Sequence, residues 1–509
     1  MEKDAVLNVV KDKTKTYSQQ VLALAQLAEG EDRTIDYSKE FLKAKEEGII
    51  CDLNEGKLPY RPRYICPDYK LLLEKGSEFL NLEPALDLYE ACNNLLIMYK
   101  NVPSITTFPV FLGNLDELLE PFVLKLKRDE AKKVLRMFLR HIDSTLTDSF
   151  VHADFGPKAS LTGEIIFELS VEMQLAVPNI TLKYDEDITP DDFAKKAIVS
   201  MLKCAKPSFA NHKMFTKEWG ENYAIASCYN GLLVGGGGYT LPRIKMYEAS
   251  LKAKDTDDFL NNVLPFYVDL ECDYMDKRIR FLQEESSFFN APNFLIKEGF
   301  ISKDRFVGMF GMVGLAECVD HLLGIKDKSK GFGNSEEAKE LGIRIMNRLE
   351  ELVNMHEAPY SKATGGKYRL HAQVGINTDG GEDSPGSRIP VGCEPILPLH
   401  LHHQEAFQKY FPTGTGDIFK FEETWVNSPD AVLDIIKGTL RNGLRYFSGY
   451  LENNDVVRVT GYLVKKSELA KLDRGEASLN SCTLFGQGSR DGQKSLDRKI
   501  NKYEESFSK

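Results

Sequence analysis

The stretch Arg458-Val459-Thr460-Gly461-Tyr462-Leu463, near the end of the 509-residue chain, carries most of the information about the fold. Its glycine has an ordinary interpretation as a turn residue, since glycine adopts backbone angles that other residues avoid. The polar run Asn453-Asn454-Asp455 just upstream is also typical of a turn. On the hexapeptide alone a turn and a functional glycine are both open, and the rest of the sequence has to distinguish them.

A second distinctive segment, Asn222-Tyr223-Ala224-Ile225-Ala226-Ser227-Cys228-Tyr229-Asn230, lies far upstream. A lone cysteine is usually inert packing, because cysteine is among the most buried residue types. This cysteine, however, has distinctive neighbours on both sides along the chain. They are Val177-Pro178-Asn179-Ile180-Thr181, Lys206-Pro207-Ser208-Phe209-Ala210-Asn211, the glycine run at 235–238, Thr240-Leu241-Pro242-Arg243, and Gly311-Met312-Val313-Gly314-Leu315-Ala316-Glu317.

These segments come in the same order as in the glycyl radical enzymes, and the chain resembles that family from about residue 150 to about residue 480. The hexapeptide is similar to the Arg-Val-x-Gly-Tyr signature around the radical-carrying glycine, which makes Gly461 the candidate radical residue. The segment around Cys228 is similar to the loop of the family's radical cysteine. The chain looks most like the YjjI-type branch, which is related to anaerobic ribonucleotide reductase and pyruvate formate-lyase.

The resemblance implies an α/β fold: a ten-stranded barrel of two antiparallel half-barrels, each with five parallel strands. Helices surround this barrel, and the loops that carry Cys228 and Gly461 meet inside it. A buried meeting point is required, because water-borne reductants and oxygen would quench a thiyl radical. We expect a helical region over residues 1–105, the barrel core over 106–440 and a C-terminal glycyl radical domain over 441–509.

Hydrophobic patterns add local expectations. Apolar residues at three-and-four spacing predict helices over residues 9–28, 71–79 and 86–99. Short apolar runs predict parallel strands, covered by helices, at 165–167, 180–182 and 224–226. The glycine run at 235–238 lacks the lysine of a phosphate-binding loop, so close backbone packing is expected there.

The resemblance also implies a mechanism and its partners. A separate radical S-adenosylmethionine activase removes a hydrogen atom from Gly461, the glycyl radical takes one from Cys228, and the thiyl radical takes one from the substrate. Glycine suits this task because its amide nitrogen and carbonyl share the unpaired electron and no Cβ crowds the planar centre. No permanently bound cofactor is implied. The expected partners are the activase, a small-molecule substrate and a second copy of the chain in a homodimer.

The leading hypothesis for the reaction is hydrogen abstraction from a small polar metabolite, leading to elimination, bond cleavage or reduction. Nucleotide or nucleoside reduction, as in anaerobic ribonucleotide reductase, is an alternative, and a barrel that binds a ligand without turnover is another. Pyruvate formate-lyase uses two adjacent cysteines, whereas Cys228 stands between Ser227 and Tyr229. Diol dehydratases have a glutamate base two residues after the cysteine, where this chain has Asn230, and an amide cannot take a proton from a hydroxyl.

Five further residues are candidates for contact with the substrate. They are Asn179, Tyr229, Asn230, His400 and His402. We expect His400 and His402 to share one face of a strand. No metal site is expected at these histidines, because Glu405 is the one cysteine or carboxylate at a suitable spacing.

Other candidates have weaker arguments. Cys393, in Gly392-Cys393-Glu394-Pro395, resembles the cysteine of diol-dehydrating relatives, but it follows the segment at 311–317 that the thiyl cysteine precedes in the family. It is therefore the second choice after Cys228. The run His152-Ala153-Asp154 and the pair Glu164 and Glu168 could serve acid–base chemistry, although an i,i+4 pair is also the pattern of a helix face.

The composition restricts the class of protein. A formal net charge of −11 argues against a nucleic-acid-binding protein, which would show a concentrated basic face. The nine cysteines have no regular spacing, which favours a reducing compartment over a disulfide framework. The N-terminus is charged from Glu2 onward and no run of about eighteen apolar residues occurs, so neither a signal peptide nor a membrane span is expected. The expected location is the cytoplasm.

Overall fold

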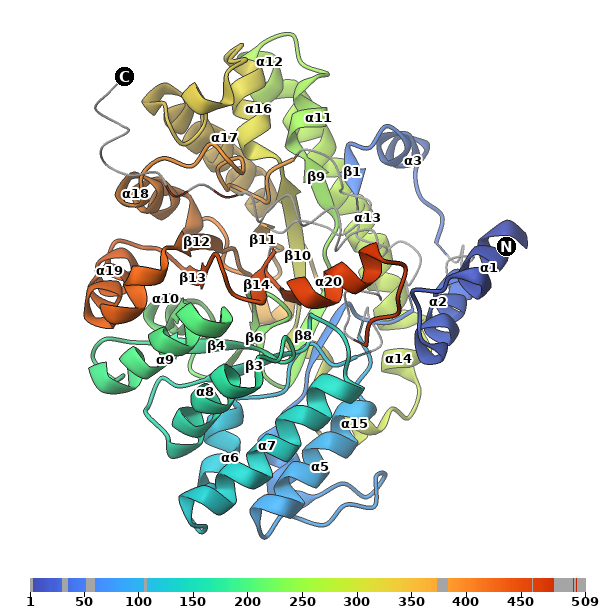
Figure 1. Ribbon diagram of the computed structural model, residues 1–509. Helices are drawn as coiled ribbons and strands as arrows, with labels where there is room; N and C mark the ends of the chain where they lie inside the picture. Colours follow the sequence, from blue (N-terminus) through green and yellow to red (C-terminus); the bar gives the residue numbers. More distant parts are fainter. Residues whose placement is uncertain are drawn as a thin grey trace.

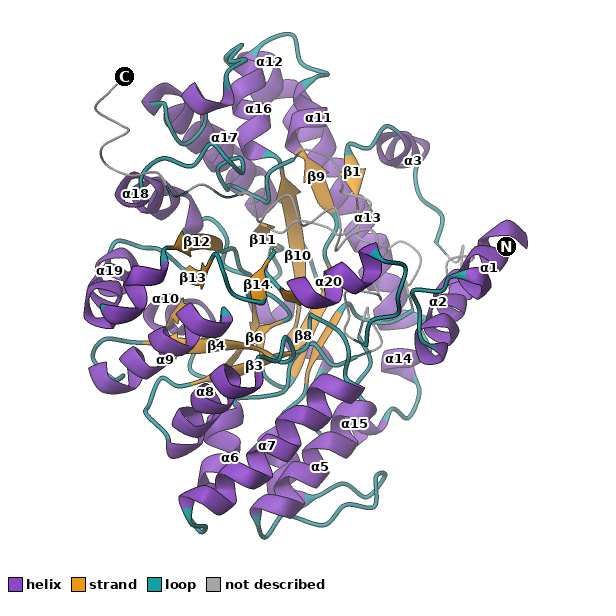
Figure 2. Cartoon of the chain, in the orientation of Figure 1, coloured by secondary structure: helices purple, strands orange, loops and turns teal. Residues whose placement is uncertain are grey.

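The computed structural model describes residues 3–29, 35–51, 60–104, 108–372, 383–459, 461–479, 498 and 500 (Figure 1). Within these residues a six-stranded and a five-stranded sheet occupy the middle of the molecule. Figure 2 shows helices around both sheets. Two further pairs of strands form separate hairpins, and these carry the two loops of interest.

The described part of the first hundred residues forms helices and two short strands. The elements are α1 (Lys3–Lys11), α2 (Tyr17–Glu29), α3 (Lys39–Glu46), β1 (Ile50–Cys51), β2 (Tyr64–Cys66), α4 (Tyr69–Lys75) and α5 (Leu88–Lys100). The helix expected over 9–28 is interrupted between α1 and α2, because the Asp12 carboxylate accepts the Thr14 backbone N–H at 2.8 Å. Strands β1 and β2 also lie in the region expected to be helical, and they are too short to show a strand period in the sequence.

The next elements supply three parallel strands of the five-stranded sheet. They are α6 (Leu115–Val123), α7 (Arg128–Thr145), β3 (His152–Phe155), α8 (Leu161–Met173), β4 (Asn179–Tyr184), α9 (Asp191–Cys204), β5 (Ser208–Asn211) and α10 (His212–Trp219). Strands β3, β4 and β5 pair in parallel, and the strand predicted at 180–182 is confirmed in β4.

The strand predicted at 165–167 is wrong, because these residues belong to α8. Ser160 caps this helix, and its Oγ accepts the backbone N–H of Gly163 at 3.0 Å. The three apolar residues at 165–167 are all buried in this helix, so they form a short continuous run that resembles a buried strand in the sequence.

The middle of the chain forms the six-stranded sheet and the helices around it. The elements are β6 (Tyr223–Ala226), β7 (Asn230–Leu233), β8 (Gly236–Thr240), β9 (Arg243–Lys245), α11 (Met246–Ser250), α12 (Thr256–Asp258), α13 (Leu264–Glu284), α14 (Ser287–Asn290), α15 (Phe294–Lys297), β10 (Phe306–Val313), α16 (Leu315–Leu322), α17 (Glu336–Met355) and β11 (Arg369–Ala372). Strand β10 runs parallel to β8, β9 and β11, while β1 and β2 add antiparallel edges. Residues 224–226 form strand β6, but it pairs antiparallel with β7 and not in parallel as predicted.

The glycine run at 235–238 allows backbones to approach closely beside this sheet. A Cβ on Gly236 would lie 2.1 Å from the carbonyl oxygen of Arg305. One on Gly237 would lie 2.0 Å from the carbonyl oxygen of Tyr64. The expectation of close packing is thus confirmed.

The last described elements complete the five-stranded sheet and add the second hairpin. They are α18 (Leu397–Gln408), β12 (Asp417–Phe421), α19 (Pro429–Arg441), β13 (Tyr446–Leu451), β14 (Val456–Arg458), β15 (Leu463–Lys465) and α20 (Lys466–Asp473). Strands β12 and β13 are parallel to each other, and β13 pairs antiparallel with β5. Two sets of parallel strands therefore meet in opposite directions, as two half-barrels require.

One continuous hydrophobic core joins the sheets to the helices. Cys228, Tyr229 and Tyr462 belong to it, so both predicted loops lie in the interior. In the part of the chain that the structure describes, no helix has the length and apolar character needed to cross a membrane.

Candidate active site

Gly461 lies at the tip of the β14–β15 hairpin, directly against Cys228. The two strands pair antiparallel, with Arg458 opposite Leu463. A Cβ added to Gly461 would lie 2.1 Å from the Cβ of Cys228 and 2.5 Å from its Sγ. Because a carbon–carbon bond at Cα is about 1.5 Å long, the Gly461 Cα lies within about 4 Å of the sulfur. The two candidate radical residues are in van der Waals contact.

Space, and not turn geometry, explains the glycine at position 461. Its φ angle lies outside the left-handed region, so other residues could adopt this backbone. A side chain has no room, however, because Cys228 fills the position of the Cβ and the Cε1 of Tyr229 would lie only 2.9 Å from it. The interpretation of the hexapeptide as an ordinary turn therefore does not account for this residue.

Two side chains hold the Gly461 carbonyl. The Nδ2 of Asn179, at the start of β4, donates to it at 2.9 Å, and the Nη1 of Arg458 donates at 3.2 Å. The Nη2 of Arg458 also donates to Asn179 Oδ1 at 3.0 Å and to the carbonyl of Ala205 at 2.9 Å. Arg458 is fully buried, which strengthens these charge-assisted bonds. Asn179, a predicted substrate contact, thus binds the glycine loop in this structure.

The Cys228 loop is the tip of the β6–β7 hairpin and has a constrained backbone. Ser227 has a φ of +61°, which is uncommon for a residue with a side chain. Its backbone N–H donates to the Val110 carbonyl at 2.8 Å. On the far side of the tip, the Nδ2 of Asn230 donates to the Ala226 carbonyl at 2.7 Å and closes the loop.

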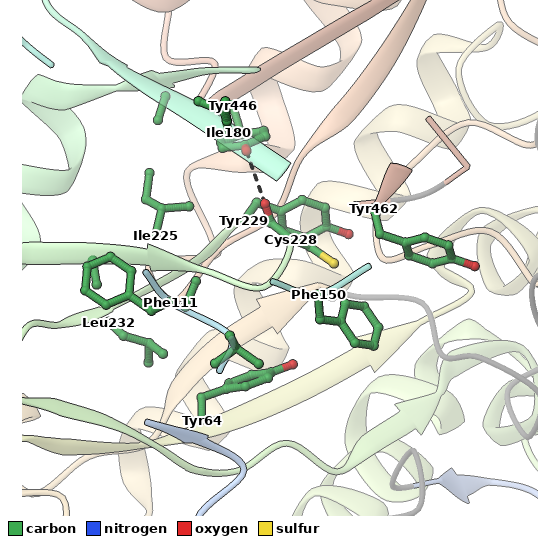
Figure 3. Close-up of a cluster of buried hydrophobic side chains, with 14 of the residues drawn as sticks. Tyr64, Phe111, Phe150, Ile180, Ile225, Cys228, Tyr229, Leu232, Tyr446 and Tyr462 are labelled. Atoms are coloured by element: carbon green, nitrogen blue, oxygen red, sulfur yellow. Dashed lines mark hydrogen bonds between the residues drawn. The ribbon is translucent and has the colours of Figure 1, made fainter. Parts of the chain in front are cut away.

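Neutral side chains bind the two carbonyls of this tip. The Nδ1 of His152 lies 2.7 Å from the Ser227 carbonyl, and the Tyr446 hydroxyl donates to the Cys228 carbonyl at 3.1 Å (Figure 3). The Thr181 hydroxyl contacts both the Tyr446 hydroxyl and, at 2.8 Å, the Nε2 of His152. Burial lowers the pKa of His152 to about 3, so the imidazole is neutral and Nδ1 carries its proton.

The thiol of Cys228 is completely buried. Figure 3 shows its sulfur on the side of the loop that faces Phe150 and Tyr462. Burial raises the pKa of Cys228 to about 12, against smaller lowering effects from a Ser227 hydrogen bond and nearby arginines. The residue is therefore a neutral thiol near pH 7, with an S–H bond available for transfer of a hydrogen atom.

A polar chain extends from the two loops to α18. The Nη2 of Arg388 donates to the Tyr229 hydroxyl at 3.3 Å, and its Nε lies 3.7 Å from Asp417 Oδ1. The other carboxylate oxygen of Asp417 lies 2.7 Å from the Nε2 of His400. Burial raises the pKa of Asp417, but the nearby His400 and Arg388 lower it by more, so the net shift of this pKa is downward. The structure thus links two predicted residues, Tyr229 and His400, through two that were not predicted.

The prediction that His400 and His402 share a strand face is wrong. Both lie in α18, which begins with a proline in its first turn. Residues two apart point to nearly opposite sides of a helix. His400 is buried against Asp417, whereas the side chain of His402 is 70% exposed and lies near Glu405.

The other residues that the sequence suggested for catalysis do not take part in the Cys228–Gly461 contact. The carbonyl of Cys393 accepts a bond from Asn334 at 2.8 Å, and the atoms nearest the missing Cβ of Gly461 belong to Cys228 and Tyr229. Glu168 pairs with Arg128 on the surface, which confirms the helix-face interpretation. In the described ranges, no group of three or more histidine, cysteine or carboxylate side chains is placed to hold a metal ion.

Asp154 and Lys183 form a buried pair behind the Cys228 loop. The Nζ of Lys183 lies 3.4 Å from Asp154 Oδ2, which also accepts the backbone N–H of Ile225 at 2.7 Å. Burial raises the pKa of Asp154 to about 7, although Lys183 opposes this shift. The pair therefore supports the strand that leads to Cys228.

Comparisons with known proteins agree with this geometry. The family model described as "Glycyl radical enzyme YjjI-like" matches residues 15–501. A protein of Haemophilus influenzae is 44% identical over 503 residues, which cover 97% of each chain. The YjjI protein of Escherichia coli K12 is 40% identical over 460 residues, which cover 90% of this chain and 88% of that one.

Solved structures show the same fold at low sequence identity. Hydroxyproline dehydratase of Clostridioides difficile, with trans-4-hydroxy-L-proline bound, has a TM-score of 0.68 at 12% identity and covers 99% of this chain and 89% of its own. An anaerobic ribonucleotide reductase of Thermotoga maritima, with glycerol in its active site, has a TM-score of 0.67 at 14% identity and covers 92% and 88%. The α/β barrel predicted from the sequence is confirmed.

Proposed function

Because the chain belongs to the YjjI-like glycyl radical enzymes, we propose that Gly461 stores the radical and that Cys228 relays it to a small polar metabolite. The observation that carries this proposal is the contact between the two residues, in which the Cβ and Sγ of Cys228 take up the space of a Cβ at Gly461. A hydrogen atom passes between Cα and sulfur only across such a short separation. Both residues are buried, which protects a radical from solvent.

The relay balances with one hydrogen atom at each step. The Gly461 radical takes the hydrogen of the Cys228 S–H bond, which restores the glycine Cα–H bond and leaves a thiyl radical. The thiyl then takes a hydrogen atom from a substrate C–H bond, which restores the thiol and leaves a substrate radical. Elimination, cleavage or reduction of that radical completes the reaction. The high pKa of Cys228 keeps the hydrogen on sulfur before the first step.

The initial radical comes from outside the chain. A separate radical S-adenosylmethionine activase supplies the 5′-deoxyadenosyl radical that takes one α-hydrogen from Gly461. Since Gly461 is buried at the tip of the β14–β15 hairpin, against Cys228, this tip has to move for the activase to reach it. The hydrogen bonds from Asn179 and Arg458 would break on opening and re-form on closure.

Electron spin resonance tests the proposal. After anaerobic incubation with the activase, S-adenosylmethionine and a reductant, the protein should give a doublet, because one α-hydrogen remains on the glycyl radical. Gly461→Ala should abolish the signal, and Gly438→Ala, at a glycine outside the site where a Cβ would meet no atom within 4 Å, is the matched control. A doublet that persists in Gly461→Ala would remove the assignment.

A further inference from the structure

Arg388 is a buried cation that the fold holds rigidly beside the site. Its Nε donates to the Gly416 carbonyl at 2.5 Å, and its Nη2 donates to the Tyr229 hydroxyl at 3.3 Å. The guanidinium also lies 5.6 Å from the centre of the Tyr229 ring. Only 4% of the residue is exposed. These contacts fix the plane of the guanidinium and leave its second terminal nitrogen, Nη1, without a hydrogen-bond partner among the described residues.

Two more buried polar atoms near Arg388 and Cys228 lack partners. The Oγ of Ser387 is buried and has no hydrogen bond within the described ranges. The same holds for the Oδ1 of Asn230, two residues after the thiol. Ser387 precedes Arg388 in the chain, and Asn230 follows Tyr229, whose hydroxyl Arg388 contacts. Leaving a buried polar atom unpaired costs about 1 to 3 kcal/mol, so these atoms indicate a ligand that completes them.

The charges around Cys228 point to the sign of that ligand. Arg388 and Arg458 are both buried, and the acceptors of Arg458 in the described chain are the neutral oxygens of Gly461, Asn179 and Ala205. Arg388 has a carboxylate, Asp417, at 3.7 Å, but this carboxylate lies closer to His400, at 2.7 Å. Among these buried groups the two arginines therefore outnumber the one carboxylate.

We infer that the substrate carries an anionic oxygen group, a carboxylate or a phosphate, that binds Arg388 through Nη1. The Ser387 hydroxyl donates a second hydrogen bond to the same group, and Asn230 Oδ1 accepts one from a hydroxyl or amine of the substrate. Arginine suits such a group because its planar fork matches the oxygens of carboxylates and phosphates. Through Tyr229, which lies against both Gly461 and Arg388, the anion is placed next to the radical pair.

The inference rests on the proposed function, because only an enzyme has a substrate at this site, but binding of the anion can be tested without the radical. Unactivated full-length protein is titrated with 13C-acetate and, separately, with inorganic phosphate at constant ionic strength, and binding is followed by NMR line broadening. Acetamide, the neutral counterpart of acetate, is the control ligand. Saturable binding of acetate alone supports a carboxylate substrate, and binding of phosphate supports a phosphate ester. Binding of neither anion, or equal binding of acetamide, overturns the inference.

Variants then locate the binding site. Arg388→Gln should weaken binding of the anion roughly tenfold or more, since it removes a charge-assisted bond, and Arg388→Lys should keep part of the affinity. Arg474→Gln, at an exposed arginine, should change nothing. Unchanged affinity in a folded Arg388→Gln protein would overturn the inference, and if that variant does not fold, the same decision rests on Arg388→Lys. If the wild-type protein binds the anion but gives no glycyl doublet after incubation with the activase, the proposed function is refuted and the inference about the anion stands.

Discussion

The two hairpin tips that meet at the site are held in different ways. The Cys228 tip is bound through its own backbone, by Val110 and by the side chains of His152 and Tyr446, which come from different strands. The Gly461 tip is bound at one carbonyl by two polar side chains, Asn179 and Arg458. Both hairpins are separate from the two large sheets. The first tip is the more firmly held, because a backbone hydrogen bond anchors it as well as side chains, whereas the second is docked through side chains.

Backbone strain follows the same division. Ser227 keeps a left-handed φ of +61°, which requires surroundings that over-determine its conformation. Gly461 needs no special φ and is a glycine because Cys228 occupies the side-chain position. The Cys228 tip can therefore stay in place while the Gly461 tip moves out of the interior. This difference suits an enzyme whose glycine has to be reached by a separate activase.

The largest effect is expected at the junction of the two tips. If hydrogen passes reversibly between Gly461 and Cys228, activated protein in D2O exchanges its α-hydrogen through the S–D bond. The spin-resonance doublet then collapses to a near-singlet, because deuterium couples weakly to the electron. In Cys228→Ser the doublet should form and stay a doublet, since an O–H bond is too strong for the glycyl radical to break. The ratio of the doublet to the near-singlet, followed over time, measures the rate of α-hydrogen exchange.

Cys393→Ser is the matched control for this exchange. It should behave like the wild type, with collapse at the same rate. Collapse in Cys228→Ser together with a lasting doublet in Cys393→Ser would mean that the thiyl residue is Cys393.

A second effect separates the docked tip from the rigid one. Asn179→Ala removes one bond to the Gly461 carbonyl and one acceptor of Arg458. We expect local opening of the β14–β15 hairpin to become easier by about 1 to 2 kcal/mol, with little change at β6–β7. Hydrogen–deuterium exchange of the two hairpins measures this difference. Asn101→Ala, which removes a similar bond on the surface, should leave both unchanged.

The opposite pattern is expected from the cysteine side. Tyr446→Phe removes the hydroxyl that binds the Cys228 carbonyl, so opening of the β6–β7 tip should become easier by about 1 kcal/mol. The β14–β15 hairpin should exchange as before. Tyr17→Phe, at a side chain that is 80% exposed, is the control. Equal loosening of both hairpins would contradict the division between a rigid and a docked tip.

The smallest effect is expected from pH. Because burial raises the pKa of Cys228 to about 12, its S–H bond stays intact at every pH well below that value. The rate of α-hydrogen exchange should therefore be flat from about pH 6 to about pH 9, whereas an ordinary thiol with a pKa of about 8.5 would ionise and slow the exchange. A fall in rate near pH 8.5 would show that Cys228 is not desolvated.

The sequence predicted the pair Cys228 and Gly461 and the barrel, because both depend on local motifs with a fixed order. It did not predict Tyr446 or Arg388, which reach the loops from segments more than 150 residues away in the chain. No local pattern marks a tyrosine that binds one distant carbonyl. The error at His400 and His402 has a similar origin, since a short histidine-rich run fits a strand and a helix equally well until its packing is known.

Exposure of activated protein to air tests radical storage at Gly461 most directly. Dioxygen adds to the Cα radical, and the peroxyl product breaks the backbone at that residue. Mass spectrometry should find a large fragment that ends near Thr460 and a short one that begins near Tyr462, both absent from unactivated protein and from Gly461→Ala. An intact chain after exposure of a sample with a measured radical signal, or cleavage at another glycine, would contradict radical storage at Gly461.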